Sequence, residues 1–312
     1  MKKSRIVFST TKQWNPGDEL ILHGIRNLLG EHVFIMFNRH PFISFNNRVG
    51  DNSYYFGMGD EIIDHAIFAG SPEYQTQPNY DMYRLIAKQK IPFSYIGVGG
   101  MPFVKGVPFH KATVKIVRDS LAANIEGSTL LPCPSIYANK TLDLEPVKKK
   151  EKIGFCYQAN LRYICSPSQT VNDLCVKFIE EYKPLVICHS YVDYVEAEKN
   201  GWDCFYSANY HDYKEAYSKL DLLVGTRIHG SGWCASMGIP SILIPHDERW
   251  ETGQNLGANI FNGKEFSDLI LQFEQFDVEK ESKRIIQLRK ETFPKYMSFL
   301  EPVFGTPSGW EK

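Results

Sequence analysis

The residues best suited to chemistry in this sequence lie in the stretch LLVGTRIHGSGWCASMGIPSILIP, from Leu222 to Pro245. An apolar run typical of a strand leads into Thr226, Arg227 and His229, which precede small residues typical of a closely packed helix. A helix N-terminus favours anions because its N–H groups and dipole present positive potential. Thr226 can cap the helix or donate a hydroxyl, Arg227 can bind phosphate or carboxylate, and His229 can bond a phosphate oxygen or deliver a proton. The pattern predicts a site for a small anionic ligand, with a phosphorylated one favoured.

The spacing of Arg227 and His229 sets a condition on this site. Residues at i and i+2 do not share a helical face, so both reach one ligand only if the helix begins at or after Ile228. The loop after the next apolar run, PHDERWETGQNLG, adds His246 to the same edge, followed by two carboxylates. Those carboxylates are acceptors for a polar substrate or simply part of a solvated loop.

A second candidate loop, TTKQWNPGDELILHG, follows the first apolar run of the chain. It supports two interpretations. In one, Asn15 caps a helix that starts at Pro16, and Asp18 bonds back to the cap. In the other, Gly17 lets a ligand approach the backbone while Asp18 accepts from, or deprotonates, sugar hydroxyls. Asp18 cannot fill both roles equally well.

A third candidate loop lies in the run YIGVGGMPF, where Gly97, Gly99 and Gly100 follow an apolar strand pattern. The spacing is not that of a dinucleotide-binding glycine motif, so a tight turn and a ligand-binding loop both stay open. Further on, Arg118 is followed directly by Asp119. Such a pair is typical of a solvated or mutually paired surface feature, and its alternative is an anion clamp at a domain interface.

Composition limits the classes of function. The 312 residues suggest about two domains. Hydrophobic residues make up 43% and charged residues 23%, which supports a folded core. With 35 basic and 36 acidic residues the net charge is −1, which argues against nucleic acid as a partner. Anion recognition must therefore be local.

The cysteines favour a reduced, cytoplasmic protein. Seven cysteines are an odd number, and none forms a CxxC pair. Metal ligation by Cys156, Cys165 or Cys188 with His189 is open on spacing alone, but no strong metal motif exists and we predict no metal. No apolar run is long enough for an integral membrane segment, and no signal peptide is apparent. The sequence leaves a homo-oligomer open.

The order of elements predicts an α/β fold with two Rossmann-like domains facing a cleft. The expected strands are RIVFST, HVFIMFN, HAIFAG, PFSYIGVGG, KIGFCY, LVICHS, DCFYSA, DLLVGT and PSILIP. Helical patterns lie between them, including one around FHKATVKIV, and the charged segment DLEPVKKKEK is the linker candidate. The expected division is an N-terminal domain over 1–142, a linker over 143–152, a C-terminal domain over 153–285 and a helical tail over 286–312.

Four of these stretches resemble the polysaccharide pyruvyl transferase family. NPGDELIL is similar to its N-x-G-D-x-x-I-L opening, IGVGGMPF to its mid-chain glycine segment, and RDS to its R-D-x-x-S stretch. GTRIHGSGWCASMGIP is similar to its most distinctive segment, a G-x-R-x-H core followed by small residues and G-[VI]-P. The matches run in order over roughly residues 5 to 260.

This resemblance implies a GT-B-like fold and a transferase that uses no cofactor. The implied reaction moves a pyruvyl group from phosphoenolpyruvate to a pair of sugar hydroxyls, forming a ketal and releasing phosphate. It implies that Arg227 and His229 hold the donor in the C-terminal domain, with the sugar or glycan acceptor on the N-terminal side. The mechanistic hypothesis adds Arg118 as a secondary clamp, His229 for phosphate contact or proton delivery, and Asp18 to orient or deprotonate the acceptor.

Two departures from the family concern the acceptor side. AGSPEY stands where members often carry a run of glycines, and LPCPSIYA stands where many have Asp-Pro. A GT-B glycosyltransferase using a nucleotide sugar is one alternative, although no carboxylate lies between Thr226 and Pro245 to hold a ribose. A non-catalytic anion- or glycan-binding relative is the other.

Overall fold

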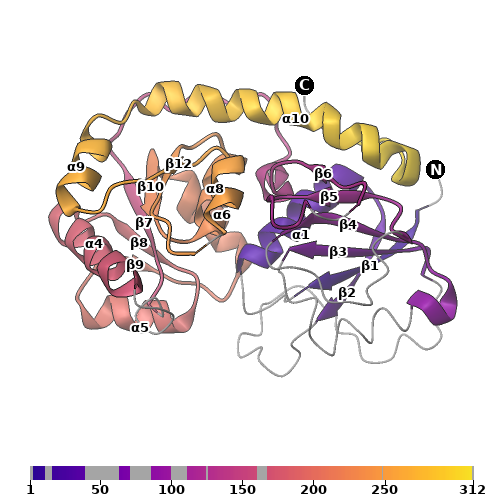
Figure 1. Cartoon of the computed structure of the whole chain (residues 1–312), viewed down its shortest axis with the longest axis horizontal. Helices are drawn as coiled ribbons and strands as arrows, with labels where there is room; N and C mark the ends of the chain where they lie inside the picture. The colour runs from indigo at the N-terminus through magenta and orange to yellow at the C-terminus, as the bar shows by residue number, and fades with distance from the viewer. Residues whose placement is uncertain are drawn as a thin grey trace. The chain divides into compact units, whose positions relative to one another are not determined.

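All strand pairs in the described part of the chain are parallel, and they form two sheets (Figure 1). The computed structural model describes residues 3–10, 16–38, 63–70, 86–99, 111–123, 126–159, 167–247 and 249–310. The chain divides into a first unit, residues 1–142 with 289–312, and a second unit, residues 143–288. Parallel strands need crossover connections, so helices between successive strands follow directly from this arrangement.

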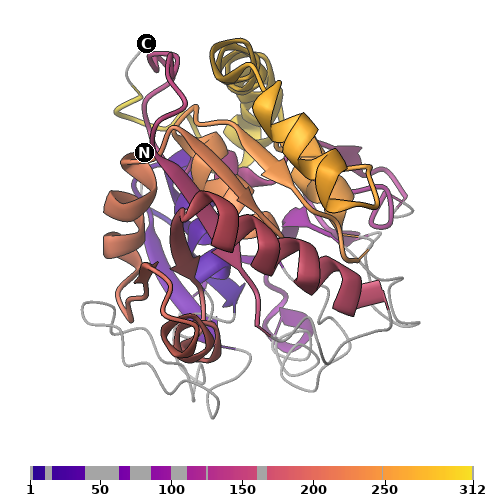
Figure 2. The ribbon, with the colours of Figure 1, turned by 90° about the vertical axis from the view of Figure 1, so that its left-hand side faces the viewer.

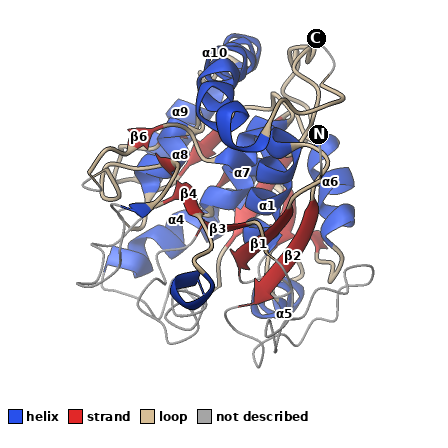
Figure 3. Cartoon of the chain, turned by 90° about the vertical axis from the view of Figure 1, so that its right-hand side faces the viewer, coloured by secondary structure: helices blue, strands red, loops and turns tan. Residues whose placement is uncertain are grey.

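The first unit contains a six-stranded sheet in the order β2-β1-β3-β4-β5-β6 among the described residues (Figure 3). Its elements are β1 (Arg5–Thr10), α1 (Pro16–Leu29), β2 (Val33–Asn38), β3 (His65–Gly70), β4 (Phe93–Val98), β5 (Lys115–Val117), β6 (Thr129–Leu130) and the 3-10 helix η2 (Pro134–Tyr137). Every residue of β3 and β4 is buried, as expected for central parallel strands covered on both faces. The strand order reverses between β1 and β3, which is where such sheets bind ligands.

The second unit contains a sheet in the order β9-β8-β7-β10-β11-β12, the order of a dinucleotide-binding Rossmann domain. Its elements are β7 (Ile153–Tyr157), α4 (Pro167–Tyr182), β8 (Leu185–Cys188), α5 (Tyr191–Lys199), β9 (Cys204–Phe205), α6 (Tyr210–Ser218), β10 (Leu222–Gly225), α7 (Ile228–Ser236), β11 (Ser241–Leu243), α8 (Trp250–Asn255), β12 (Asn259–Ile260) and α9 (Phe266–Glu274). The first part of α10 (Val278–Phe304) also belongs to this unit. Here the order reverses between β7 and β10.

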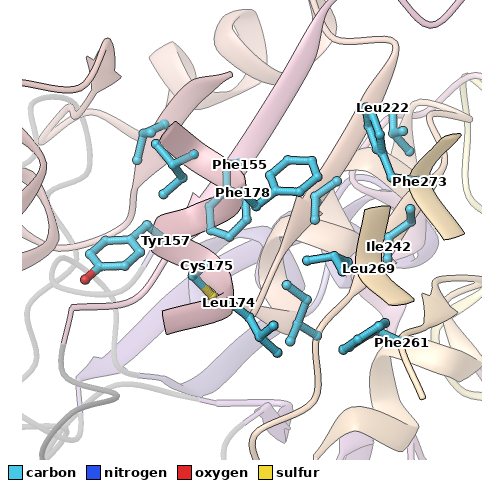
Figure 4. Packing of buried hydrophobic residues seen from close by; sticks show 14 of the residues in the cluster. Phe155, Tyr157, Leu174, Cys175, Phe178, Leu222, Ile242, Phe261, Leu269 and Phe273 are labelled. Carbon is cyan, nitrogen blue, oxygen red and sulfur yellow. The ribbon is translucent and has the colours of Figure 1, made fainter. Parts of the chain in front are cut away.

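The core of the second unit joins its sheet to α4 and α9 (Figures 2 and 4). Phe155 from β7 packs on Phe178 of α4 with ring centroids 5.7 Å apart, and Phe178 meets Phe273 of α9 edge-on at 5.1 Å. Leu222 and Leu269 are fully buried in the same cluster. These apolar contacts hold the strands so that their carboxyl ends form one edge.

Helix α10 spans the division between the units, which falls between Leu288 and Arg289. Its second half is tied to the first unit by buried polar groups. Tyr137 shares a 2.6 Å hydrogen bond with Thr292, and the Tyr296 hydroxyl donates to the carbonyl of Pro132 at 2.6 Å. Most of the segment that we expected to form a C-terminal helical tail, 286–312, thus belongs to the first unit.

The expected helix around FHKATVKIV is wrong, because Lys115–Val117 forms strand β5. The β-branched residues of TVKIV favour a strand, and the buried side chains of Val114, Ile116 and Val117 pack in the sheet. Helix α8 lies in the segment that we interpreted as a charged loop. Residues 143–152 form neither helix nor strand. None of the described helices is both long and apolar enough to cross a membrane.

Helix α1 lies unusually close to η2 at Gly24. A Cβ placed on Gly24 would lie 1.8 Å from the carbonyl oxygen of Pro134. Alanine normally stabilises a helix by about 1 kcal/mol relative to glycine. We predict that Gly24→Ala instead destabilises the protein by about 3 kcal/mol, because backbone must move to admit the methyl group. Urea unfolding measures this, and an unchanged or higher stability would refute the close packing.

His65 gives the first unit a defined pH dependence. Its Nε2 lies 2.8 Å from the Ser94 hydroxyl, its ring packs edge-on against Phe304, and burial lowers its pKa to about 4. Below an unfolded-state pKa of about 6.5, the unfolded chain takes up the proton first, so stability falls as pH falls towards 4. Between pH 7.5 and pH 5, we predict that the wild type loses about 2 kcal/mol more stability than His65→Gln. The free energy of unfolding in urea, measured for both proteins at both pH values, tests this. An equal loss of stability in the two proteins would contradict it.

Candidate functional site

Helix α7 begins at Ile228, so the condition set by the spacing of Arg227 and His229 is met. Arg227 is the N-cap residue and has an extended backbone (φ −90°, ψ 118°). Its side chain is therefore attached just before the first helical residue. His229 is the second helical residue and is half-buried. The carbonyl of Arg227 accepts from the N–H of Gly230 at 2.9 Å. The cationic side chain therefore lies at the positive end of the helix dipole.

Two glycines bring this turn against strand β7. A Cβ on Gly225 would lie 2.6 Å from the carbonyl oxygen of Cys156, and one on Gly230 would lie 3.0 Å from the Cys156 side chain. The N–H of Thr226 donates to the same carbonyl at 3.2 Å. The glycines of this segment thus allow the end of β10 and the first turn of α7 to lie directly on β7, where the strand order reverses.

Arg227 is held by two groups from neighbouring loops. Its Nε donates to the carbonyl of Tyr157 at 3.0 Å, and its Nη2 forms an ion pair with Asp193. The Asp193 side chain is 1% exposed and that of Arg227 is 22% exposed. Within the described part of the chain, the Nη1 group of Arg227 has no hydrogen-bond partner. One edge of the guanidinium is therefore fixed, and the other can meet a ligand.

Asp193 was not singled out from the sequence. It stands at the third position of α5 and forms a capping box with Ser190. Its carboxylate also accepts from the N–H of Ala159 at 2.9 Å, in the loop after β7. The S-x-x-D pattern directly after the strand LVIC signals the capping box. Nothing local in the sequence signals the pairing with Arg227, 34 residues away.

Thr226 does not cap the helix, because Arg227 holds that position. Its side chain is 1% exposed. Its hydroxyl has no hydrogen-bond partner among the described residues. A buried hydroxyl usually finds a partner, so the expected role as an O–H donor to a ligand stays open.

Beneath the turn lies a buried polar cluster of Cys156, His189 and Tyr217. His189 Nε2 lies 2.8 Å from the Tyr217 hydroxyl and 3.6 Å from the Cys156 sulfur. Burial raises the pKa of the Cys156 thiol to about 12, so it stays protonated. The described residues contain no group of histidine, cysteine and carboxylate side chains suited to a metal, and Cys165 lies outside them. This cluster is packing beneath the site.

His246 follows β11 in an ion-paired loop. Its Nε2 lies 3.2 Å from the Asp247 carboxylate, which also pairs with Arg249. Burial opposes ionisation of Asp247, but the hydrogen bonds from His246 and Arg249 and the charge of Arg249 outweigh it and hold its pKa well below the usual range. Glu248 lies outside the described residues. The loop is thus an organised salt-bridged turn, with the His246 side chain only 6% exposed.

In the first unit, Asp18 lies at the corresponding edge of the sheet. Gly17 and Asp18 are buried in the first turn of α1. A Cβ placed on Gly70, the last residue of β3, would lie 3.3 Å from Asp18 Oδ1. Gly70 has φ +79°, a conformation that other residues rarely adopt. Asn15, the expected cap of this helix, lies outside the described residues.

Arg118 and Asp119 form no solvated surface pair, which corrects one interpretation of the sequence. Arg118 is 4% exposed and Asp119 is fully buried, and both follow β5. A Cβ on Gly99 would lie 2.2 Å from Asp119 Oδ2 and 2.5 Å from Arg118 Nε, so Gly99 leaves room for these side chains. Gly100 lies outside the described residues. The glycine loop and the Arg-Asp pair, interpreted separately from sequence, are one packed feature.

The structure thus gathers Thr226, Arg227 and His229 at one turn of the second unit. In the first unit it brings Gly99 to Arg118, while Gly17 and Asp18 lie by the end of β3.

The sequence matches the family described as polysaccharide pyruvyl transferase over residues 15–248. Among curated proteins, none matches it significantly.

Solved structures with the same fold include UDP-GlcNAc 2-epimerases. The enzyme of Methanocaldococcus jannaschii, in complex with UDP-GlcNAc and UDP, has a TM-score of 0.55 at 13% identity, covering 93% of this chain and 99% of that one. MnaA of S. aureus with UDP has a TM-score of 0.56 at 12% identity, covering 99% of this chain and 100% of that one. At this identity the likeness concerns the fold alone. Together with the two sheets, it confirms the predicted α/β class with two Rossmann-like, GT-B-like domains.

Proposed function

The chain belongs to the polysaccharide pyruvyl transferase family, and we propose that it moves a pyruvyl group from phosphoenolpyruvate to a sugar or glycan acceptor. The observation that carries the donor assignment is the turn at the start of α7. Arg227, the buried hydroxyl of Thr226 and half-buried His229 gather there at the positive end of a helix. This turn lies where the strand order reverses, the usual ligand position in such sheets.

The donor's charge suits this turn. Phosphoenolpyruvate carries a phosphate and a carboxylate, and the planar guanidinium of Arg227 can bind either group with paired hydrogen bonds. The remaining N–H groups at the start of α7 can bond further oxygens. His246, which follows the adjacent strand β11, is a second candidate to contact the same ligand.

The proposed chemistry begins with a proton delivered to the methylene carbon of the enol, which leaves an oxocarbenium-like centre at the neighbouring carbon. A sugar hydroxyl attacks that centre and gives its proton to a base. Phosphate then leaves, a second hydroxyl takes its place with loss of a further proton, and a ketal results. We assign proton delivery or phosphate contact to His229, and acceptor orientation or deprotonation to Asp18. A positioned acid contributes about 10²- to 10⁴-fold to such a step.

The acceptor is assigned to the first unit. Asp18 lies beside Gly70 at the end of β3, and a carboxylate there can accept from sugar hydroxyls. We propose that the acceptor is bound by Asn15, Gly17, Gly99 and Gly100. Arg118 is proposed as a secondary clamp. No resident cofactor is proposed. We also propose a cytoplasmic site of action, in keeping with the reduced cysteines expected from the sequence.

A glycosyltransferase using a nucleotide sugar is the competing function. The solved structures in complex with UDP favour it, because they share this fold. Helix α7 argues against it, since the helix carries no carboxylate to hold a ribose. A non-catalytic glycan-binding relative is a third candidate, which product formation with any acceptor would exclude.

Calorimetric titration of phosphoenolpyruvate tests the donor site. We predict saturable binding by the wild type that weakens about 10- to 100-fold in Arg227→Ala, the loss of charge-assisted hydrogen bonds worth roughly 1.5–3 kcal/mol. Arg227→Lys restores part of the affinity, because lysine keeps the charge but lacks the fork.

Arg284→Ala is the matched control. Arg284 pairs with Glu281 on α10, so its removal costs an ion pair but no proposed ligand contact. Equal affinity of wild type and Arg227→Ala would refute the donor site. Binding of UDP in place of phosphoenolpyruvate would favour the glycosyltransferase.

A further inference from the structure

Asp193 is one of the buried charged residues to which the proposed function gives no role. Asp193 is at the start of α5, and its side chain is 1% exposed. A carboxylate removed from water is costly unless every lone pair finds a donor, and a buried ion pair by itself is weak grounds for stability. The contacts of Asp193 indicate a role for this carboxylate.

Each oxygen of Asp193 is bonded. Oδ1 accepts from the N–H of Ala159 at 2.9 Å. Oδ2 accepts from the N–H of Ser190 at 3.1 Å and from Nη2 of Arg227. These partners lie after β7, after β8 and after β10, so one carboxylate connects the carboxyl ends of three strands. Both backbone bonds also fix the carboxylate itself, leaving it little freedom to follow a moving arginine.

Arg227 is therefore gripped at two points. The carbonyl of Tyr157 takes Nε–H, and Asp193 takes an N–H of Nη2. In a planar guanidinium, Nε–H and the nearer Nη2–H lie on one edge. When that edge is held, the end formed by Nη1 and the outer Nη2–H is bonded to no group in the described part of the chain. Its parallel donors match two oxygens of a phosphate or carboxylate.

We infer that Asp193 is a positioning residue that orients the Arg227 fork towards the donor's anionic group. This inference rests on the proposed function. Electrostatic repulsion alone predicts the opposite effect, since a carboxylate beside an anion site repels the ligand. If Asp193 acts only by repulsion, anions bind more tightly when it loses its charge. If it orients Arg227, they bind more weakly.

The test is phosphoenolpyruvate titration of the full chain with Asp193→Asn. We expect affinity to fall about tenfold, roughly the loss of one charge-assisted hydrogen bond at the ligand. The loss should vanish in an Arg227→Ala background, because there is no fork left to orient. Asp193→Glu, which keeps the charge but shifts the carboxylate by one methylene, should also bind more weakly and serves if Asp193→Asn does not fold.

Ser190→Ala is the control for a merely structural role. The Ser190 hydroxyl accepts from the N–H of Asp193 at 3.3 Å, so this variant weakens the same helix cap without touching Arg227. It should keep the wild-type affinity even where it lowers the melting temperature. A Ser190→Ala affinity that falls as far as that of Asp193→Asn would assign the effect to α5 stability and overturn the inference.

The remaining outcomes separate the two proposals. If the wild type binds phosphoenolpyruvate and Asp193→Asn binds it equally well or better, the positioning role is wrong and the donor site stands. If the folded wild type binds neither phosphoenolpyruvate nor inorganic phosphate, with or without a glycan acceptor, the proposed function fails and the positioning role fails with it.

Discussion

The ion pair between Arg227 and Asp193 is the interaction on which the arrangement of the strand ends in the second unit depends. A charge as deeply buried as Asp193 must be satisfied completely, and its donors come from the loops after β7, β8 and β10. These bonds join the loops after three strands to the first turn of α5 and to the residue that caps α7. The same bonds that remove the cost of burying the carboxylate also set the orientation of the one arginine at the start of α7.

That ion pair depends on close packing below it. Gly225 and Gly230 have no side chain that would collide with Cys156, so the start of α7 can lie directly against this residue. Tyr217 stacks on Trp233 of α7, with ring planes 6° apart, and bonds His189 and Cys156 underneath. The small residues in this segment thus serve close packing first, and the proposed anion site follows from where they allow the helix to start.

The sequence predicts what is encoded locally. The bounds of β1 and β3 match the apolar runs, and the start of α7 follows from a strand pattern that meets a run of small residues. What the sequence could not reveal depends on distant partners. Arg118–Asp119 looked like a surface pair because burial beside Gly99 comes from another strand, and Asp193 looked like an ordinary cap because Arg227 lies far along the chain. The prediction of a helix over 109–117 was wrong because a short apolar run is compatible with both the helical and the strand periodicity.

The two units present different charged side chains at the points where the order of their strands reverses. Where the strand order reverses in the second unit, the strand ends present a guanidinium and a helix N-terminus. At the reversal in the first unit, between β1 and β3, a carboxylate lies beside the glycine that ends β3. A cationic edge suits a donor with phosphate and carboxylate groups, and a carboxylate suits hydroxyls that must lose protons. The arginine in the second unit and the carboxylate in the first are therefore the physical basis for the proposed division between donor and acceptor.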